Sequence, residues 1–298
     1  MTEGEERNMN ISILTASYPV DRLTYEEVAE LAQTAGETDG LQYEQLLHLY
    51  ASAEAGISGF YVLAYDDDED RLVAAASAID EIGFHTFESS LVVHPLYRSI
   101  GVGTAIHEAL EQALAVRQSA GALMLAKEHA PYNEVFLQKC GYGYSFSEAT
   151  FMTQPASLQE AVAVTLRPYA SADLARVASL YEQAFGDTLE ESEQLLEYNT
   201  AQQQTTIWVA EHQDEVVGTI TTTIYEDELN ITALAVEQTM RGQGIGSHII
   251  ALVKDEAYKK QVVTITLDVE SENEQAWSFY VKNGFKKVSQ TNYFVKLG

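Results

Sequence analysis

Three glycines lie within five residues of the stretch MRGQGIGSHII (residues 240–250), directly before a run that resembles the start of a helix. Glycine adopts positive φ without steric cost, so such a loop can bring several backbone N–H groups close to a ligand. At the positive end of a helix these groups can bind an anion. The loop is therefore a candidate cradle for a phosphate, although a lone glycine cluster is more often only a tight turn.

Two common phosphate-binding patterns do not fit this loop. RGQGIGSH has no following Lys-Ser/Thr pair as a P-loop would, and the strand after its helix lacks the isolated acidic residue of a dinucleotide fold. The acidic run DDDED (66–70) likewise lacks the spaced ligands of a calcium loop. We expect a solvated hairpin turn there and no metal site.

The glycine loop has a second copy earlier in the chain. ESSLVVHPLYRSIGVGTAIH (88–107) aligns with ITALAVEQTMRGQGIGSHII (231–250) at an offset of 143 residues. FLQKCGYGYSF (136–146) aligns with FYVKNGFKKVS (279–289) at the same offset. Two matches that share one offset indicate an internal duplication.

The elements expected around each copy also agree in order, which predicts two α+β units of domain size. We expect the N-terminal domain at 1–153, a linker at 154–161 near a proline and small polar residues, and the C-terminal domain at 162–298. In the second half, β-branched runs and helical spacing predict three strands within 206–236, a helix at 245–260, a strand at 262–269, a helix at 273–283 and a final pair of short strands. The first half repeats this plan with strands at 59–65, 71–79 and 87–93, a helix at 102–118, a strand at 122–126, and then a helix and a strand.

Composition narrows the classes of partner. The formal net charge of -28 argues against binding to nucleic acid or to an anionic membrane, and it suits a cationic or amine-bearing substrate, although the acidic residues could serve only solubility. No apolar run is long enough to cross a bilayer, and the acidic start differs from a signal peptide, so we expect a cytoplasmic protein. The single cysteine, Cys140, excludes an internal disulfide framework and a cysteine-cluster metal site.

The motifs of the second half resemble those of the GNAT superfamily of N-acetyltransferases. LAVEQTMRGQGIGS matches the family's Gln/Arg-x-x-Gly-x-Gly/Ala signature after an apolar strand, and NEQAWSFYVKNGF (273–285) matches its later Asn, Ala, Phe-Tyr and Gly-Phe pattern. The resemblance covers residues 162–298 and extends, with weaker motifs, to 10–153. It implies two tandem GNAT-like domains, each a mixed, mostly antiparallel, twisted sheet flanked by helices.

The resemblance also implies acetyl-CoA as co-substrate, bound in a V-shaped opening between the strands ITALAV and VVTITLDV. Main-chain groups around Ala235 and Val236 would bond the pantetheine arm like an added strand, and the loop amides would hold the pyrophosphate. Asn273 stands where the family often bonds the cofactor near its pantetheine or sulfur. The loop residues expected to bind the cofactor are Arg241, Gly242, Gln243, Gly244, Ile245, Gly246 and Ser247.

The mechanism that the resemblance implies is direct transfer from the thioester to a neutral amine. Tyr280 occupies the family's tyrosine position, where its hydroxyl would protonate the departing CoA thiolate. Glu226 and Glu228 lie where the family often places a carboxylate, or a water bound by one, that deprotonates the incoming ammonium. Alternation would put both on one face, which does not choose between them, and both could instead be solvated turn residues.

The first half departs from this pattern. Leu137 stands in place of Tyr280 and Ala130 in place of Asn273. We therefore expect a degenerate N-terminal domain that has a structural or substrate-shaping role. A possible second cofactor site remains at Val93, Arg98, Gly101, Gly103 and Thr104.

The predicted function is transfer of the acetyl group of acetyl-CoA to a primary amine of a small-molecule or peptide acceptor, catalysed by the C-terminal domain. Neither a nucleic acid nor a membrane is an expected partner. We expect the acceptor pocket in loops at residues 185–200 and near Tyr225. The alternatives are a noncatalytic acyl-CoA-binding or regulatory module, and a scaffold that forms a homodimer through its degenerate half.

Overall fold

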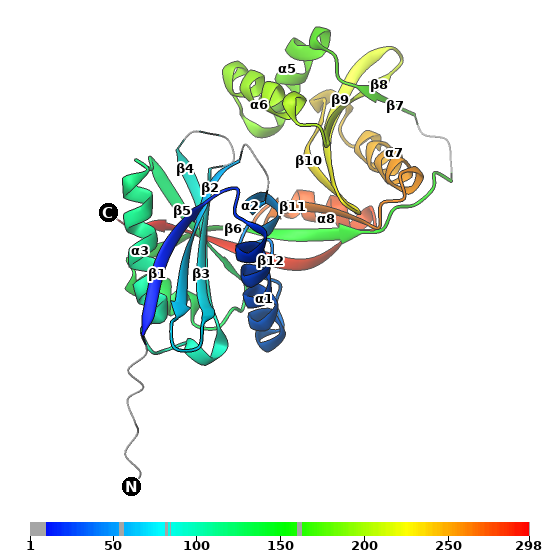
Figure 1. The fold of residues 1–298 in the computed structure, drawn as a ribbon. Coiled ribbons are helices and arrows are strands. Elements are labelled where there is room, and N and C mark those ends of the chain that lie inside the picture. The colour runs from blue at the N-terminus through cyan, green and yellow to red at the C-terminus, as the bar shows by residue number, and fades with distance from the viewer. Residues whose placement is uncertain (1–9, 54–56, 81–82, 84, 160–162, 298) are drawn as a thin grey trace. The chain divides into compact units, whose positions relative to one another are not determined.

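The computed structural model describes residues 10–53, 57–80, 83, 85–159 and 163–297 (Figure 1). Contacts between residues divide the chain into two compact units. Unit 1 comprises Met1–Ser147 together with Thr291–Gly298, and unit 2 comprises Glu148–Gln290. Residues 160 and 161 of the predicted linker lie outside the described residues.

Unit 1 contains a mixed sheet. Neighbouring strands are antiparallel except β4 and β5, which run parallel. The last strand of the chain, β12, joins this sheet through Thr291–Val295, which pair with β5. The order is β1 (Ile11–Ser17), β2 (Ser58–Asp66), β3 (Arg71–Asp80), β4 (Thr86–Val93), β5 (Gly121–Lys127) and β12 (Lys286–Lys296).

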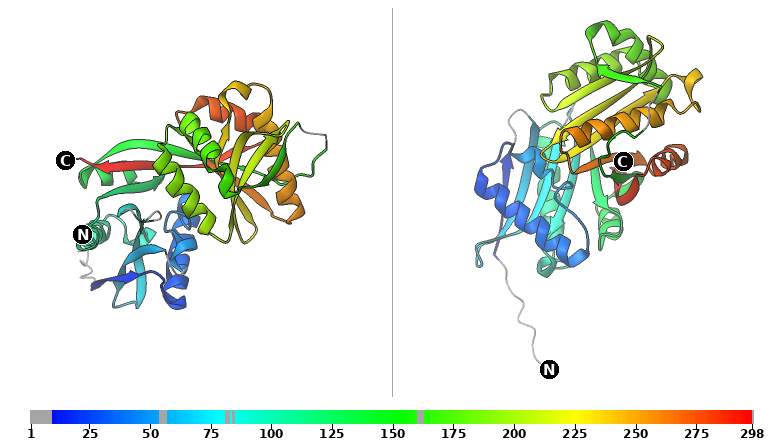
Figure 2. Two further views of the ribbon diagram at one scale, coloured as in Figure 1. Left: turned by 90° about the horizontal axis from the view of Figure 1, so that it is seen from above. Right: turned by 90° about the vertical axis from the view of Figure 1, so that its right-hand side faces the viewer.

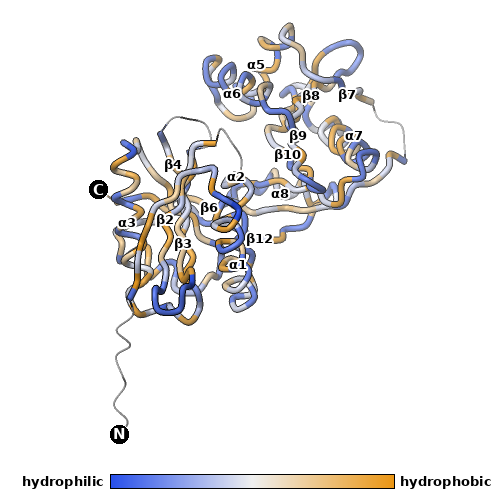
Figure 3. The backbone as a smooth tube through the Cα atoms, viewed as in Figure 1, coloured by the Kyte–Doolittle hydropathy of each residue, from blue (hydrophilic) through white to orange (hydrophobic). Residues whose placement is uncertain are grey.

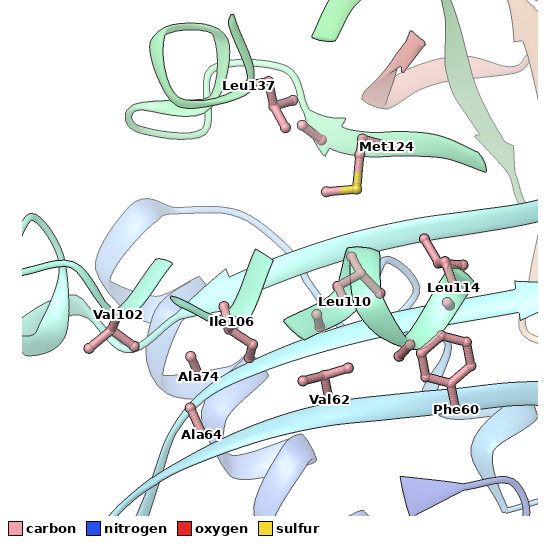
Figure 4. Packing of buried hydrophobic residues seen from close by; sticks show 14 of the residues in the cluster. Phe60, Val62, Ala64, Ala74, Val102, Ile106, Leu110, Leu114, Met124 and Leu137 are labelled. Carbon is pink, nitrogen blue, oxygen red and sulfur yellow. The ribbon is translucent and has the colours of Figure 1, made fainter. Parts of the chain in front are cut away.

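Helices cover both faces of the unit 1 sheet, because alternate residues of its strands are apolar on both sides. Phe60, Val62 and Ala64 of β2 pack in one buried cluster with α3, and Figure 4 shows them beneath that helix. Tyr61 and Leu63 face the other way, into a cluster with α1. The helices are α1 (Arg22–Asp39), α2 (Leu49–Ser52), α3 (Val102–Val116) and α4 (Asn133–Lys139).

Unit 2 repeats this plan, with β10 and β11 as its parallel pair. Figure 2 shows α7 on one face of its strands and α5 and α6 on the other. The strand order is β7 (Thr165–Pro168), β8 (Thr205–His212), β9 (Glu215–Tyr225), β10 (Glu228–Val236), β11 (Thr264–Glu270) and β6 (Tyr142–Thr153). The helices are α5 (Leu174–Phe185), α6 (Leu189–Ala201), α7 (Ile245–Lys259) and α8 (Glu274–Lys282).

The predicted fold class is confirmed, and the strands and helices expected around both glycine loops are present. Three details differ. The expected final pair of short strands is one strand, β12, and residues 185–200 are mostly the helix α6 rather than a loop. The sequence analysis predicted no helix at residues 22–39, where α1 lies. This helix is capped by Asp21, whose side chain accepts hydrogen bonds from the backbone N–H of Leu23 and Thr24.

The two compact units each contain a strand segment from the other half of the sequence. Residues Glu148–Thr153 of β6 pair with β11 in unit 2, and Thr291–Val295 of β12 pair with β5 in unit 1. Each segment lies next to the second strand of a parallel pair. The repeat seen in the sequence is therefore a repeat of loops and central strands, while the last strand of each unit comes from elsewhere in the chain.

Hydrophobic residues gather along the strands and the helix faces that meet them, and hydrophilic residues fill the turns (Figure 3). The acidic run at 66–70 forms the β2–β3 turn, in which Asp67 to Asp70 are exposed. Within the described part of the chain, no helix is both long and apolar enough to span a membrane.

Candidate functional site

The parallel strands of unit 2 separate soon after they begin. Glu228 to Asn230 of β10 pair with Thr264 to Thr266 of β11, and no later pair is found between these strands among the described residues. On its other side β10 stays paired with β9, where a bulge follows Thr232. The edges of β10 and β11 beyond Asn230 and Thr266 thus offer backbone groups to an extended ligand. Ala235 and Val236, the predicted pantetheine contacts, lie on this part of β10.

The parallel strands of unit 1 separate in the same way. Thr86 to Ser90 of β4 pair with Gly121 to Leu125 of β5, and beyond these residues the described parts of the two strands are not paired with each other. Both units therefore contain a V-shaped opening between their central strands, which leads toward the glycine loop.

Both loops end in a glycine that starts a helix without a side-chain cap. Gly101 precedes α3 with φ +97°, and Gly244 precedes α7 with φ +84°, so a side chain at either position would be strained. Gly242 also has positive φ. The first-turn N–H groups of both helices, including those of Ile245, Gly246 and Ser247 in α7, have no intrahelical partner. Both loops thus meet the geometric requirement for binding an anion.

The last glycine of each motif, Gly246 in unit 2 and Gly103 in unit 1, lies where the helix after the loop packs against the later helix. A Cβ at Gly246 would lie 3.1 Å from the ring of Phe279 on α8. A Cβ at Gly103 would lie 3.5 Å from the ring of Phe136 on α4, which is an ordinary contact. The packing is tighter in unit 2, where the aromatic residue directly precedes Tyr280.

The two loop arginines share one contact and differ in another. The Nε of Arg98 donates to the carbonyl of Val93, and the Nε of Arg241 donates to the carbonyl of Val236, each at 3.0 Å. The remaining guanidinium nitrogens of Arg98 donate to both oxygens of Asp39, at 2.8 and 2.7 Å, and this pairing raises the pKa of Arg98. Arg241 is exposed and forms no ion pair with any described carboxylate. Its charge is thus available to a ligand, whereas that of Arg98 is neutralised.

Two other predicted cofactor contacts have partners within the protein. The Oδ1 of Asn273 accepts a hydrogen bond from the backbone N–H of Ala276 and caps α8. The Nε2 of Gln243 donates to the carbonyl of Thr239 at 3.1 Å. Both side chains therefore have a local structural role, and their contact with a cofactor stays a prediction.

Tyr280 lies on α8 among aromatic rings. Its ring centroid is 5.1 Å from that of Phe279 and 5.6 Å from that of Phe285, and it packs against the buried core of unit 2. Burial raises the pKa of Tyr280 to about 12, and its hydroxyl has no hydrogen-bond partner among the described side chains and backbone. The hydroxyl is thus protonated at neutral pH and available to donate. Its counterpart Leu137 is 3% exposed in the unit 1 core, beside Met124 in Figure 4.

The two candidate bases occupy different environments. Glu226 is exposed in the β9–β10 turn with φ +51°, so the strand alternation expected to place both glutamates on one face does not apply. Glu228 begins β10, and its carboxylate accepts a hydrogen bond of 2.7 Å from the hydroxyl of Thr266. Thr266 also accepts from the amide of Asn230, at the point where β10 and β11 separate. The geometry thus favours Glu228 over Glu226.

Unit 1 contains a cavity of about 430 Å³ at its own opening. All five residues of the possible second cofactor site line it: Val93, Arg98, Gly101, Gly103 and Thr104. Its wall also includes Tyr43, Lys127 and Asn133, which the sequence analysis did not single out. No motif points to them. Tyr43 lies far before the glycine loop in the chain, and Lys127 and Asn133 differ in type from the residues at the corresponding positions of the second half, Glu270 and Ala276.

A smaller cavity in unit 2, of about 140 Å³, lies elsewhere. Leu252, Lys259 and Trp208 are among its lining residues, which include neither the glycine loop nor Tyr280. It lies near the C-terminal end of α7 and is not part of the predicted site.

A mixed sheet whose central parallel strands separate beside a glycine-opened helix is thus present twice in the chain, as the resemblance to N-acetyltransferases implies. The model of the acetyltransferase (GNAT) family matches residues 23–142 and 174–285. The chain belongs to the GNAT family, as its motifs indicated, and both halves carry the family's features.

Related proteins agree with this assignment. A stretch of 94 residues, 30% of this chain, is 32% identical to N-acetyltransferase 8B of Homo sapiens and spans 41% of that protein's length. The structure of a GCN5-related N-acetyltransferase from Sphaerobacter thermophilus matches with a TM-score of 0.73 at 18% identity, over 95% of each chain. A tandem GNAT protein from the clavulanic acid biosynthesis pathway matches with a TM-score of 0.68 at 14% identity, over 95% of this chain and 98% of that one. The structural matches show a shared fold that covers both units.

Proposed function

We propose that unit 2 transfers the acetyl group of acetyl-CoA to a primary amine. The observation that carries the proposal is the asymmetry between the two glycine loops. Of the two units, only unit 2 has both a loop arginine without a carboxylate partner in the described residues, Arg241, and a tyrosine in the later motif, Tyr280. Charge-assisted contacts to a pyrophosphate are stronger than neutral ones, so Arg241 supports cofactor binding in unit 2.

Tyr280 supplies the acid of the reaction. The amine nitrogen attacks the thioester carbonyl carbon, the C–S bond breaks as the tetrahedral intermediate collapses, and the thiolate of CoA leaves. The hydroxyl of Tyr280 gives its proton to that sulfur, and the resulting phenolate takes up the excess proton that the attacking nitrogen carries after the C–N bond has formed. Because burial raises the pKa of Tyr280 to about 12, the side chain holds its own proton across the neutral range.

Glu228 supplies the base. An amine is mostly protonated at neutral pH and must lose a proton before it attacks. The hydrogen bond from Thr266 fixes the carboxylate of Glu228 at the point where the strands separate. Asp268 follows Thr266 by two residues and so lies on the same face of β11, where its carboxylate would further favour a cationic acceptor.

The test is a panel of primary amines assayed for release of free CoA thiol. Removal of a general acid typically lowers the rate by about 10² to 10⁴-fold, so Tyr280→Phe should lower kcat by about that factor with little change in the KM for acetyl-CoA. Tyr258→Phe is the matched control, because Tyr258 is 57% exposed on α7. Release of CoA at the wild-type rate by Tyr280→Phe would contradict the role of the hydroxyl.

A second pair of variants tests the base. Glu228→Gln keeps the hydrogen bond to Thr266 but cannot take a proton, so kcat/KM should fall by at least about tenfold at neutral pH and recover partly as the amine deprotonates at higher pH. Glu226→Gln should behave like the wild type. The opposite ranking would assign the base to the turn. Tight binding of acetyl-CoA without turnover of any amine would favour a binding or regulatory module.

A further inference from the structure

The edge strand of the unit 1 sheet, β1, has an open outer side. Among the described strands it pairs only with β2, and it comes first in the strand order (Figure 1). The N–H of Tyr18 donates to the carbonyl of Gly59, and the carbonyl of Asn10 accepts from the N–H of Asp67. Backbone groups alternate between the two sides of a strand, so the even-numbered residues of β1 face β2. The residues whose N–H and C=O groups face outward, with no hydrogen bond to the described residues, are Ile11, Ile13, Thr15 and Ser17.

The side chains of β1 do not protect this edge. Its sequence, ISILTAS, contains no charged residue, although the formal net charge of the chain is -28. Ile13 is 37% exposed and Leu14 is 47% exposed. On the side of the sheet to which Leu14 points, α1 packs over β3 and β4 and leaves β1 uncovered. Exposed edge strands are usually protected by charge, by proline or by a covering helix, so this edge favours pairing with another strand.

The edge strand of unit 2, β7, is protected. It has only four residues. The N–H of Tyr169, directly after it, donates to the carbonyl of Ile207 on β8, so Leu166 and Pro168 face outward by the same alternation. Pro168 has no N–H to offer to a further strand. Pairing of β1 with β7 of another copy, which would build an open chain of copies, is therefore disfavoured, whereas pairing of β1 with β1 closes on itself.

β1 is complementary to itself in antiparallel pairing. The outward-facing residues of the two copies must stand opposite one another, because only they offer N–H and C=O groups. The register that pairs all of them is centred at Leu14, with Ile13 opposite Thr15 and Ile11 opposite Ser17. Leu14 then lies opposite Leu14 of the second copy, in a pair without mutual hydrogen bonds, where side chains approach most closely. This register buries the more exposed of the two large apolar side chains against its own copy.

We propose that the chain forms a two-fold symmetric homodimer in which two copies of β1 pair antiparallel across Leu14 and join the two unit 1 sheets into one. The partner is a second copy of this chain, recognised by backbone hydrogen bonds and by uncharged side chains. The net charges of the two copies repel each other, so added salt tightens the dimer. The inference concerns assembly, and it does not depend on the proposed function.

Sedimentation velocity of the full chain tests the assembly. We expect a species of twice the monomer mass whose share rises with protein concentration and with salt. Leu14→Lys places two like charges opposite each other and removes two buried leucines, so it should weaken dimerisation by at least about tenfold. Tyr258→Lys is the matched control, because Tyr258 is 57% exposed on α7, and it should dimerise like the wild type. A monomer at every concentration, or a dimer that Leu14→Lys leaves unchanged, would overturn the proposal.

Two measurements test the register. Mixing Leu14→Lys with Leu14→Glu should restore a mixed dimer, because opposite charges then face each other. With Cys140→Ser as background, oxidation should link Leu14→Cys into a disulfide-bonded dimer, whereas Ser12→Cys, which lies opposite Ala16 of the second copy, should stay unlinked. No recovery in the mixture, or stronger linking through Ser12→Cys, would overturn the assigned register. If Leu14→Lys does not fold, the crosslinking of Leu14→Cys still decides the proposal.

Discussion

Replacing the two loop arginines by alanine should affect different properties: Arg98→Ala should lower stability, and Arg241→Ala should weaken the use of acetyl-CoA. Arg98→Ala removes one partner of a buried ion pair and leaves the carboxylate of Asp39, which is 4% exposed, without its cation. Breaking such a pair costs about 3 to 5 kcal/mol, and the partial exposure of Arg98 places the expected loss near about 3 kcal/mol. Arg241 is exposed and has no ion pair among the described residues, so Arg241→Ala should change stability by less than about 0.5 kcal/mol.

Thermal and chemical unfolding measure this difference. For a unit of about 150 residues, a loss of 3 kcal/mol lowers Tm by roughly 6 to 12 °C. Far-ultraviolet circular dichroism follows both units, while tryptophan fluorescence follows unit 2, which contains Trp208 and Trp277, the two tryptophans of the chain. The loss in Arg98→Ala should therefore be larger by circular dichroism than by fluorescence. Arg98→Lys keeps the charge without the two-pronged geometry and should lie between Arg98→Ala and the wild type.

Kinetics complete the comparison. Measured below both unfolding transitions, Arg241→Ala should raise the KM for acetyl-CoA by about tenfold, because a charge-assisted contact to the pyrophosphate is lost. Arg98→Ala should leave kcat/KM within about twofold of the wild type. Equal losses of stability in the two alanine variants would refute the energetic role of the Arg98–Asp39 pair. A larger loss of activity in Arg98→Ala than in Arg241→Ala would refute the assignment of catalysis to unit 2.

Two further predictions concern packing and pH. Gly103→Ala should leave stability unchanged or raise it by up to about 1 kcal/mol. Gly246→Ala should give no such gain and should lower kcat, because its methyl would lie 3.1 Å from the ring of Phe279. Measurements of Tm and of turnover for both variants check this. His48 is 3% exposed, and burial lowers its pKa from 6.5 to about 4, so the folded state resists its protonation and the chain loses stability as the pH falls from 6.5 towards 4. Urea unfolding should show this as a loss of about 1.6 kcal/mol between pH 6.5 and 5 that is absent in His48→Asn. An equally steep loss in that variant would assign the effect to other groups.

Local sequence was sufficient for much of the architecture. The spacing of apolar residues predicted the central strands and the helices after each glycine loop, because periods of 2 and 3.6 residues reflect which face of an element is buried. The shared offset of 143 residues predicted two units of one plan. At 185–200 the sequence analysis missed a local pattern, because α6 is preceded by Thr188, which forms a capping box with Glu191.

The candidate site was predictable only where its residues lie in one motif. Arg241, Gly244 and Tyr280 are separated by fixed spacings in one half of the chain, so a pattern could find them. The choice between Glu226 and Glu228 needed the structure, because strand alternation would put both on one face, whereas the turn between β9 and β10 places Glu226 at positive φ. The hydrogen bond from Thr266 to Glu228 likewise joins residues that are 38 positions apart.

By itself, the sequence determined the duplication, the two glycine loops and the loss of the tyrosine from the first half, because each is a property of residue types at fixed spacing. Only the tertiary structure decided that the arginine of one loop is neutralised, because Asp39 lies 59 residues before Arg98 and reaches it only when α1 packs against the sheet. It also decided which strand completes each sheet. Pairing partners far apart in the chain are selected by the burial of whole faces, which no local pattern contains.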